Sequence, residues 1–269
     1  MPSTASPSTA MIGAHVPPED PIAAAADTGA GAVQFFLTDP QAWKAPAEHP
    51  HADAIRSAAR SGELRIYVHA PYRINVATTN NRIRVPSRKL LAQHATAAAA
   101  LGATAIVVHG GHLGENDDPS VGVENWRKTF AYAQNDGGFA LPVLIENTAG
   151  GTNAVARRFD RLAQLWDAVG EYDAGFCLDT CHAHAGGEDL AGIVDRVLGI
   201  TGRIDLVHAN DSRDAFDSGA DRHANFGAGQ IDAAVIADVC RAASSDVIVE
   251  TPGGPDGQGA DIAYLRSAL

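Results

Sequence analysis

The 269-residue sequence has no long hydrophobic run. Its apolar stretches end after five or six residues, whereas a membrane-spanning helix needs about 20, so we expect no transmembrane segment. The first ten residues, MPSTASPSTA, contain neither a basic nor an apolar region and do not read as a secretory signal. Their composition predicts a disordered tail over residues 1–10, followed by one folded domain over residues 11–269.

Cysteine and basic residues are also scarce. The three cysteines, Cys177, Cys181 and Cys240, form neither a Cys-x-x-Cys pair nor an even set for disulfides, which favours a reducing compartment. We therefore expect a cytoplasmic protein. Lys and Arg number 20 against 32 Asp and Glu, a formal net charge of −12. This balance argues against a general binder of polyanions, because contacts to phosphates need Lys and Arg.

Short runs rich in β-forming residues recur eight times along the chain. They cover residues 11–16, 32–37, 64–70, 105–111, 142–148, 175–182, 204–211 and 246–253. Stretches of helical period separate them, such as residues 157–170, where Phe159, Leu162, Leu165, Trp166 and Val169 follow one face. Alternating apolar strands and helices are typical of a parallel sheet covered on both faces. Eight such units predict a single-domain α/β fold, the (β/α)8 TIM barrel.

Six of these eight runs finish in a side chain suited to metal binding or acid–base chemistry. They are His69, His109, Glu146, Asp179, His208 and Glu250. One such residue after a strand is usually a loop or capping group, but the carboxyl ends of barrel strands all converge on one face. Six in register therefore predict a shared site. His15 also ends a run, and His49, His51 and His94 fall elsewhere; we expect these four outside the site.

Two further motifs add ligands to that face. In DTCH, Asp179 and His182 lie three residues apart and can point into one cavity without sharing an ion. In ADRH, Asp221 and His223 lie two apart, which in extended backbone puts both side chains on one side, as two ligands of one ion require. The set then has five imidazoles and four carboxylates. Since catalytic zinc commonly takes three protein ligands, nine ligands predict three ions, with zinc favoured and manganese or iron as alternatives.

Clustered divalent ions suit phosphodiester hydrolysis, because they activate water and stabilise charge on the phosphate. Three of them would bring the formal net charge from −12 to −6 and concentrate positive potential at the barrel mouth. The segment after the third run is basic, with Arg73, Arg82, Arg84, Arg88 and Lys89 and no acid, and Arg213 and Arg222 flank the later ligands. Two alternatives stay open: a sugar isomerase or epimerase with one or two ions, and a DNA-damage binder without turnover.

Three segments, VLIENTAGG, GFCLDTCHAHAGGEDL and LVHANDSRDAFDSGADRHANFGAG, resemble the signature segments of the endonuclease IV family. The likeness runs from IGAHV to the last strand. It implies a (β/α)8 barrel with three zinc ions that acts, typically as a monomer, on double-stranded DNA containing abasic sites. Cleavage 5′ to the abasic site would leave a 3′-hydroxyl and a 5′-deoxyribose phosphate.

The resemblance also implies which residues hold each ion. His69, His109 and Glu146 would hold the first ion. Glu146 would bridge to a second, completed by Asp179, His208 and Glu250, and His182, Asp221 and His223 would hold the third. Glu146, Asp179 and Glu250 are thus the expected catalytic carboxylates. In HGGH we favour His109 over His112 as the ligand, and we expect Cys177 and Cys181 to be packing residues.

The DNA-reading loops depart from the family pattern. HAPYRIN keeps the aromatic Tyr72 but has Arg73 where the family has an apolar side chain, and TDPQAW has Gln41 in place of an Arg. Arg73 can still contact phosphate or stack by its guanidinium plane. We expect Tyr72, Arg73, Gln41 and Arg222 to contact DNA, with abasic-site selectivity the property that these changes affect.

Overall fold

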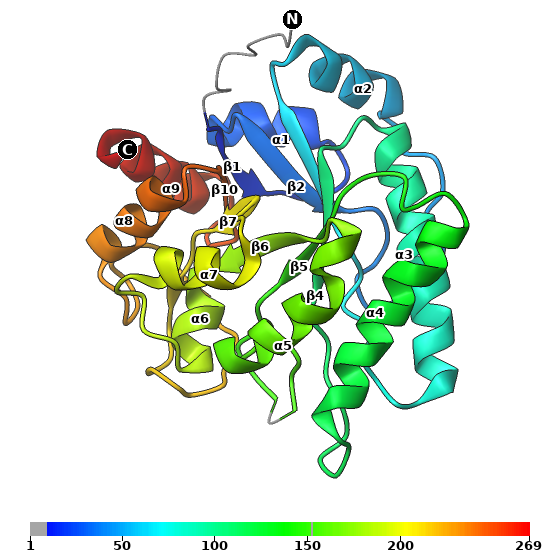
Figure 1. The fold of residues 1–269 in the computed structure, drawn as a ribbon. Helices are drawn as coiled ribbons and strands as arrows, with labels where there is room; N and C mark the ends of the chain where they lie inside the picture. The colour runs from blue at the N-terminus through cyan, green and yellow to red at the C-terminus, as the bar shows by residue number, and fades with distance from the viewer. Residues whose placement is uncertain (1–9, 152) are drawn as a thin grey trace, which may run out of the picture.

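Eight parallel strands form a closed barrel in the computed structural model, which describes residues 10–151 and 153–269 (Figure 1). Around the barrel the order is β1-β10-β7-β6-β5-β4-β3-β2. The strands are β1 (Ile12–His15), β2 (Ala32–Phe36), β3 (Arg65–His69), β4 (Ala105–His109), β5 (Val143–Glu146), β6 (Gly175–Asp179), β7 (Leu206–His208) and β10 (Asp246–Val249). All eight predicted runs are therefore confirmed as strands, and the barrel is the predicted fold. Except for Ala10, the predicted disordered tail lies outside the described residues.

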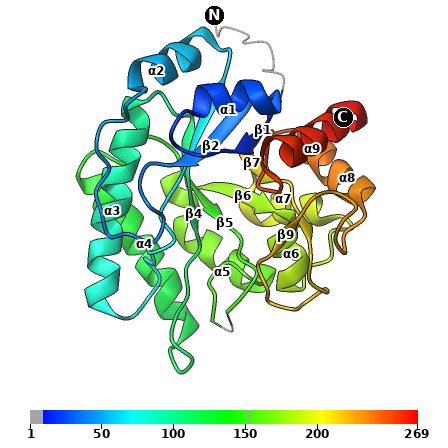
Figure 2. The ribbon, with the colours of Figure 1, turned by 180° about the vertical axis from the view of Figure 1, so that it is seen from behind.

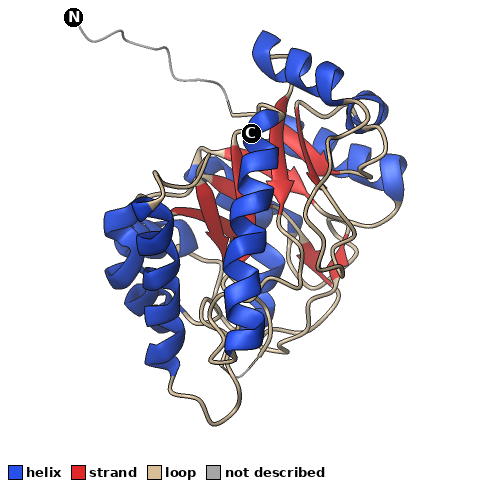
Figure 3. Cartoon of the chain, turned by 90° about the vertical axis from the view of Figure 1, so that its right-hand side faces the viewer, coloured by secondary structure: helices blue, strands red, loops and turns tan. Residues whose placement is uncertain are grey.

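The helices surround the barrel (Figure 3). They are α1 (Pro21–Thr28), α2 (Ala52–Ser61), α3 (Asn81–Ala100), α4 (Pro119–Asn135), α5 (Phe159–Val169), α6 (Thr180–Gly186), α7 (Ile193–Thr201), α8 (Ala233–Ala243) and α9 (Gly254–Ala268), with a 3-10 turn η1 (Gly170–Tyr172). A two-stranded antiparallel hairpin, β8 (Asp211–Ser212) with β9 (His223–Ala224), follows β7. None of the helices in the described part of the chain is long and apolar enough to cross a membrane.

Two apolar layers hold the barrel together. The smaller one contains interior side chains of the strands, including Tyr67, Val107, Leu144, Leu206 and Ile248. The larger one lies between strands and helices. It contains the face of α5 that the sequence predicts, since Phe159, Leu162, Leu165, Trp166 and Val169 are all buried. At the seam, β1 pairs with both β10 and β2, and α9 lies against α1 (Figure 2).

A charged network lies where the strands begin. Asp246, the first residue of β10, is 4% exposed. Its carboxylate accepts hydrogen bonds from the Tyr67 hydroxyl at 2.8 Å, from the Met11 amide at 2.8 Å and from the Arg65 guanidinium. The network therefore joins β3, β10 and the residue just before β1 at the amino end of the barrel.

Two segments that carry candidate site residues are helical. Arg82, Arg84, Arg88 and Lys89 lie on α3, which Asn80 caps: its side chain accepts from the Arg82 amide at 3.0 Å. The chain also turns directly from β6 into α6, so His182 and His184 are on a helix. Here Asp179 is the cap, accepting from the His182 amide at 2.6 Å.

Candidate metal centre

All six strand-end residues lie together at the carboxyl end of the barrel. His69, His109, Glu146, Asp179 and His208 are the last residues of their strands, and Glu250 directly follows β10. The strand registers place His109 beside Glu146 and Asp179 beside His208. The convergence predicted from the sequence is confirmed.

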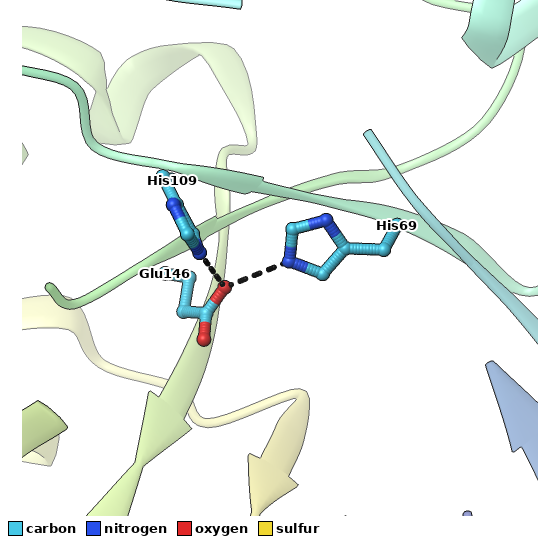
Figure 4. A group of neighbouring side chains, drawn as sticks. All are labelled: His69, His109 and Glu146. Carbon is cyan, nitrogen blue, oxygen red and sulfur yellow. Dashed lines mark hydrogen bonds and ion pairs between the residues drawn. The ribbon is translucent and has the colours of Figure 1, made fainter. Parts of the chain in front are cut away.

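The first predicted group is His69, His109 and Glu146 (Figure 4). The Nε2 atoms of His69 and His109 lie 3.2 and 3.3 Å from the same oxygen, Oε2 of Glu146. His112, the rival of His109, belongs to none of the candidate metal groups among the described residues. It lies farther along the loop, with its main chain beside Ala154 and its Nδ1 3.4 Å from the Asn75 amide nitrogen.

The second predicted group is built around the other oxygen of Glu146. Oε1 lies 3.0 Å from Nδ1 of His208, and the same nitrogen lies 3.3 Å from Oε2 of Glu250. Asp179 completes the group, with Oδ2 4.0 Å from His208 Nδ1. One carboxylate therefore presents its two oxygens to two separate sets of ligands, as a bridge between two ions requires.

The three residues of the third predicted group lie on α6, on β9 and in the segment before β9, and Asp221 contacts both histidines. Oδ1 of Asp221 lies 3.0 Å from Nε2 of His182 and 3.2 Å from Nε2 of His223. Both imidazole nitrogens are buried and make no hydrogen bond of good geometry with a described residue. Poorly satisfied buried nitrogens are costly in a protein interior, and here both face the same carboxylate oxygen. This arrangement fits a metal ion.

Asp179 and Cys181 lie closer to the third group than the sequence suggests. Oδ2 of Asp179 is 3.8 Å from Nε2 of His223, and Cys181 groups with Asp221 and His223. Asp179 is therefore in reach of both the second and third groups. Burial raises the pKa of the Cys181 thiol to about 12, so the thiol stays protonated at neutral pH, in keeping with a packing role.

The charges of the site balance each other only partly. Burial alone would raise the pKa of Glu146, but the neighbouring imidazoles of His208 and His109 outweigh it and hold that pKa well below its usual range. Burial dominates at Asp179, whose pKa is raised. Burial likewise opposes charge on His182, yet Asp179 and Asp221 raise its pKa well above the usual value. Cations at these positions would compensate the buried carboxylates, and the mixed nitrogen and oxygen donors suit zinc.

The residues expected to contact DNA surround this centre. Tyr72 is 50% exposed, and its ring stacks on His109 at 5.5 Å between centroids. Arg73 donates from Nε to the backbone carbonyl of Gln41 at 2.8 Å, so the two positions that depart from the family pattern touch each other. Arg222 is exposed and pairs with Asp214. A cavity of about 360 Å³ lies beside the site and is lined by Tyr72, His109, His112, Thr148, His182 and Asp221. Another cavity, of about 460 Å³, lies near η1 at the opposite end of the barrel.

Four polar residues of the site were missed or misplaced by the sequence analysis. Asn147 exchanges two hydrogen bonds with the main chain of Asp179, and Asn210 donates to Oδ2 of Asp179 at 2.7 Å. Both directly follow or nearly follow a ligand, in IEN and HAND, which is a usable signal. Gln34 is buried within β2, and His15 lies 3.2 Å from Glu250. The expectation that His15 lies outside the site was wrong, because β1 ends at the same face as the other strands.

Comparison with known proteins gives four findings. Residues 22–268 match the family described as xylose isomerase-like TIM barrel. The probable endonuclease 4 of Mycobacterium ulcerans is 53% identical over 259 residues, 96% of this chain and 99% of the relative. The crystal structure of endonuclease IV from Thermus thermophilus matches with a TM-score of 0.82 at 30% identity, covering 96% of this chain and 98% of that one. A D-tagatose 3-epimerase-like protein matches with a TM-score of 0.78 at 18% identity, covering 96% and 97%, a likeness of fold alone.

Proposed function

This chain belongs to the endonuclease IV family of xylose isomerase-like TIM barrels and is an endonuclease of DNA repair, and we propose that it works with three zinc ions. Its reaction is hydrolysis of the phosphodiester bond 5′ to an abasic site in double-stranded DNA, leaving a 3′-hydroxyl and a 5′-deoxyribose phosphate. The observation that carries the proposal is the placement of the two Glu146 oxygens toward two ligand groups.

Nine side chains would hold the ions. The first ion takes His69, His109 and Glu146; the second takes Glu146, Asp179, His208 and Glu250; the third takes His182, Asp221 and His223. When bound, the ions would supply a water activated near neutral pH and positive charge for the phosphate and the leaving oxygen. Manganese or iron at one of these positions is compatible with the same donors.

The residues of the chain itself place the substrate. The cavity beside His109 and His182 has a mixed polar and apolar lining and lies at the metal centre, which suits an abasic sugar phosphate. Tyr72, held on the ring of His109, presents an exposed aromatic face at the mouth, suited to stacking against a base that borders the lesion. Arg73, Gln41 and Arg222 are exposed around it, where Arg side chains can pair with phosphates.

The third ligand group supports a nuclease over a sugar epimerase. An epimerase with one or two ions has no use for His182, Asp221 and His223, whereas two imidazole nitrogens that face one carboxylate oxygen fit a third ion. The proposal includes action as a monomer. It also includes a cytoplasmic location, which the three free, buried cysteines support.

Exhaustive dialysis against a strong chelator tests the proposal. The metal-free protein should lose incision of a duplex that carries one abasic analogue, and added zinc should restore it. The reloaded protein should contain three ions per chain. The same duplex without the lesion is the control. Full incision by demonstrably metal-free protein would refute the proposal, and a content of one or two ions would favour the epimerase.

A further inference from the structure

Three ligand imidazoles are oriented by backbone carbonyls. Nδ1 of His69 lies 2.7 Å from the carbonyl of Ala70, and Nδ1 of His182 lies 2.9 Å from that of Asn147. Nδ1 of His223 lies 3.3 Å from the carbonyl of Glu250. A carbonyl can only accept, so each Nδ1 carries the proton and each Nε2 is left for an ion.

His208 is held differently. Its Nδ1 faces Glu146 and Glu250, and its Nε2 lies 2.9 Å from Oε1 of Gln34. Among the described residues, it is the one ligand imidazole whose outer nitrogen has a side-chain partner instead of a carbonyl. A substitution can remove this partner, whereas no substitution removes a main-chain carbonyl.

The hydrogen bonds of Gln34 fix the orientation of its amide. The nitrogen Nε2 lies 2.8 Å from Oε1 of Glu250 and 2.9 Å from Nδ1 of His15. Only the nitrogen can donate to a carboxylate, so the amide oxygen must face His208. His208 then carries its proton on Nε2 and leaves Nδ1 free. The same amide engages Oε1 of Glu250 and leaves Oε2 on the side of His208 Nδ1.

Burial makes this network rigid. Gln34 is 0% exposed in the middle of β2, where β2 pairs with both β1 and β3. A buried amide without partners costs about 1–3 kcal/mol, but both polar atoms of this side chain are satisfied. Gln34 is thus the single polar side chain of an otherwise apolar strand, AVQFF, and it reaches two ligands that come from β7 and from the end of β10.

We propose that Gln34 is a positioning residue for the second ion, locking His208 with Nδ1 and Glu250 with Oε2 toward it. The inference rests on the proposed function, because it requires that the second ligand group holds an ion. Partners that orient metal ligands typically contribute 10- to 100-fold to metal affinity.

Gln34→Met tests this, since methionine has a similar length and no amide. Zinc affinity is measured by competition with a chromogenic chelator. We expect two ions to keep their wild-type affinity and one to bind about 10- to 100-fold more weakly. ¹⁵N NMR of labelled histidines should assign the loss to His208, with His69, His182 and His223 unchanged. Incision should fall at limiting zinc and recover at saturating zinc.

Gln258→Met is the matched control. Gln258 is 9% exposed, and among the described residues its amide donates to the carbonyls of His15 and Thr251 alone. It should lose stability in the metal-free state much as Gln34→Met does, but keep three tight ions. If Gln34→Met does not fold, Gln34→Asn replaces it, because its shorter amide cannot span both ligands and must also loosen one ion.

A failure of the Gln34 proposal can be distinguished from a failure of the proposed function. Three ions at wild-type affinity in the Gln34 variant, or an equal loss in both glutamine variants, would overturn the positioning role while the nuclease stands. A wild-type protein that binds no ion at the second group, or cuts without ions, would overturn the proposed function itself.

Discussion

The two ends of the barrel both bury charge, but they treat it in opposite ways. At the amino end, the Asp246 carboxylate receives hydrogen bonds from Arg65, Tyr67 and the Met11 amide. At the carboxyl end, Glu146 is fully buried among imidazoles, and the nearby Nε2 atoms of His182 and His223 both face one oxygen of Asp221 without good hydrogen-bond geometry.

The difference separates structural charge from functional charge. A carboxylate whose partners are all supplied by the protein contributes to stability, and its loss leaves those partners unsatisfied. A buried cluster of imidazoles and carboxylates with metal-ligand spacing is completed by ions from outside. Changes at the amino end should therefore affect folding stability, and changes at the carboxyl end should affect activity.

The largest expected effect is the loss of activity in Glu146→Gln. An amide cannot bridge two cations as a carboxylate does, and about 4 kcal/mol of lost transition-state stabilisation corresponds to about 10³-fold. We expect at least this decrease in incision of an abasic duplex, with fewer ions bound and the circular dichroism spectrum unchanged. A variant that still cuts at a tenth of the wild-type rate would contradict a bridging role.

Asp246→Ala should lower the stability of the protein and leave its activity nearly unchanged. Removing one partner of a buried ion pair typically costs about 3–5 kcal/mol, and here it also strands the Tyr67 hydroxyl. We expect a loss of this size in the free energy of urea unfolding, with incision per folded molecule close to wild type. Tyr67→Phe, which removes one hydrogen bond only, should cost about 1 kcal/mol. If Asp246→Ala lost activity without losing stability, the contrast between the two ends would be wrong.

The sequence was sufficient to predict the barrel, and the nine ligands that it predicts stay a prediction. Continuous apolar runs such as residues 105–111 identify buried parallel strands, and a ligand at each strand end is recognisable because the barrel itself brings those ends together. The family resemblance then divides the nine into three groups. The first two coincide with clusters of the structure, whereas the third is divided between two clusters that also include Asp179 and Cys181.

What the sequence could not supply is the orientation around the ligands. Gln34 lies in an apolar run 174 positions from His208, and only the closed barrel brings their side chains to 2.9 Å. His15 looked like an ordinary strand end because its contact with Glu250 also forms only when the barrel closes. The caps at Asn80 and Asp179 are local contacts. Whether the residues after each cap form a loop or a helix depends also on the packing of α3 and α6 against the barrel.

A smaller effect is expected from an ion pair that lies near the functional end. The loop carrying Asp221 is fastened by Asp217, which accepts from Arg157 at 3.0 Å and Arg158 at 2.7 Å. Its main chain also bonds to α6 through the His184 carbonyl at 3.0 Å. Since exposed ion pairs contribute about 0–1 kcal/mol, Asp217→Asn should weaken the third ion by no more than about fivefold, as measured by chelator competition.

The matching change far from the site is Asp238→Asn, which breaks an exposed pair with Arg241 on α8. It should alter stability by a similar small amount and leave all three ions as tight as in the wild type. A loss of zinc in Asp238→Asn equal to that in Asp217→Asn would show that the effect is not carried by the loop of Asp221.

The smallest effect should come from Arg73, an exposed residue beside the metal centre at the carboxyl end of the barrel. Its guanidinium is exposed and bonds the carbonyl of Gln41, so Arg73→Ala should leave stability and metal content unchanged. If Arg73 contacts a phosphate, the dependence of log affinity on log salt should become shallower by about 1, for damaged and intact duplexes alike. Binding is measured in the Glu146→Gln background to prevent cutting, with Arg60→Ala on α2 as control. If instead affinity fell for abasic DNA alone and the salt dependence stayed unchanged, Arg73 would be assigned to reading the lesion. The exposed residues around the metal centre would then contribute to selectivity together with the cavity beside His109.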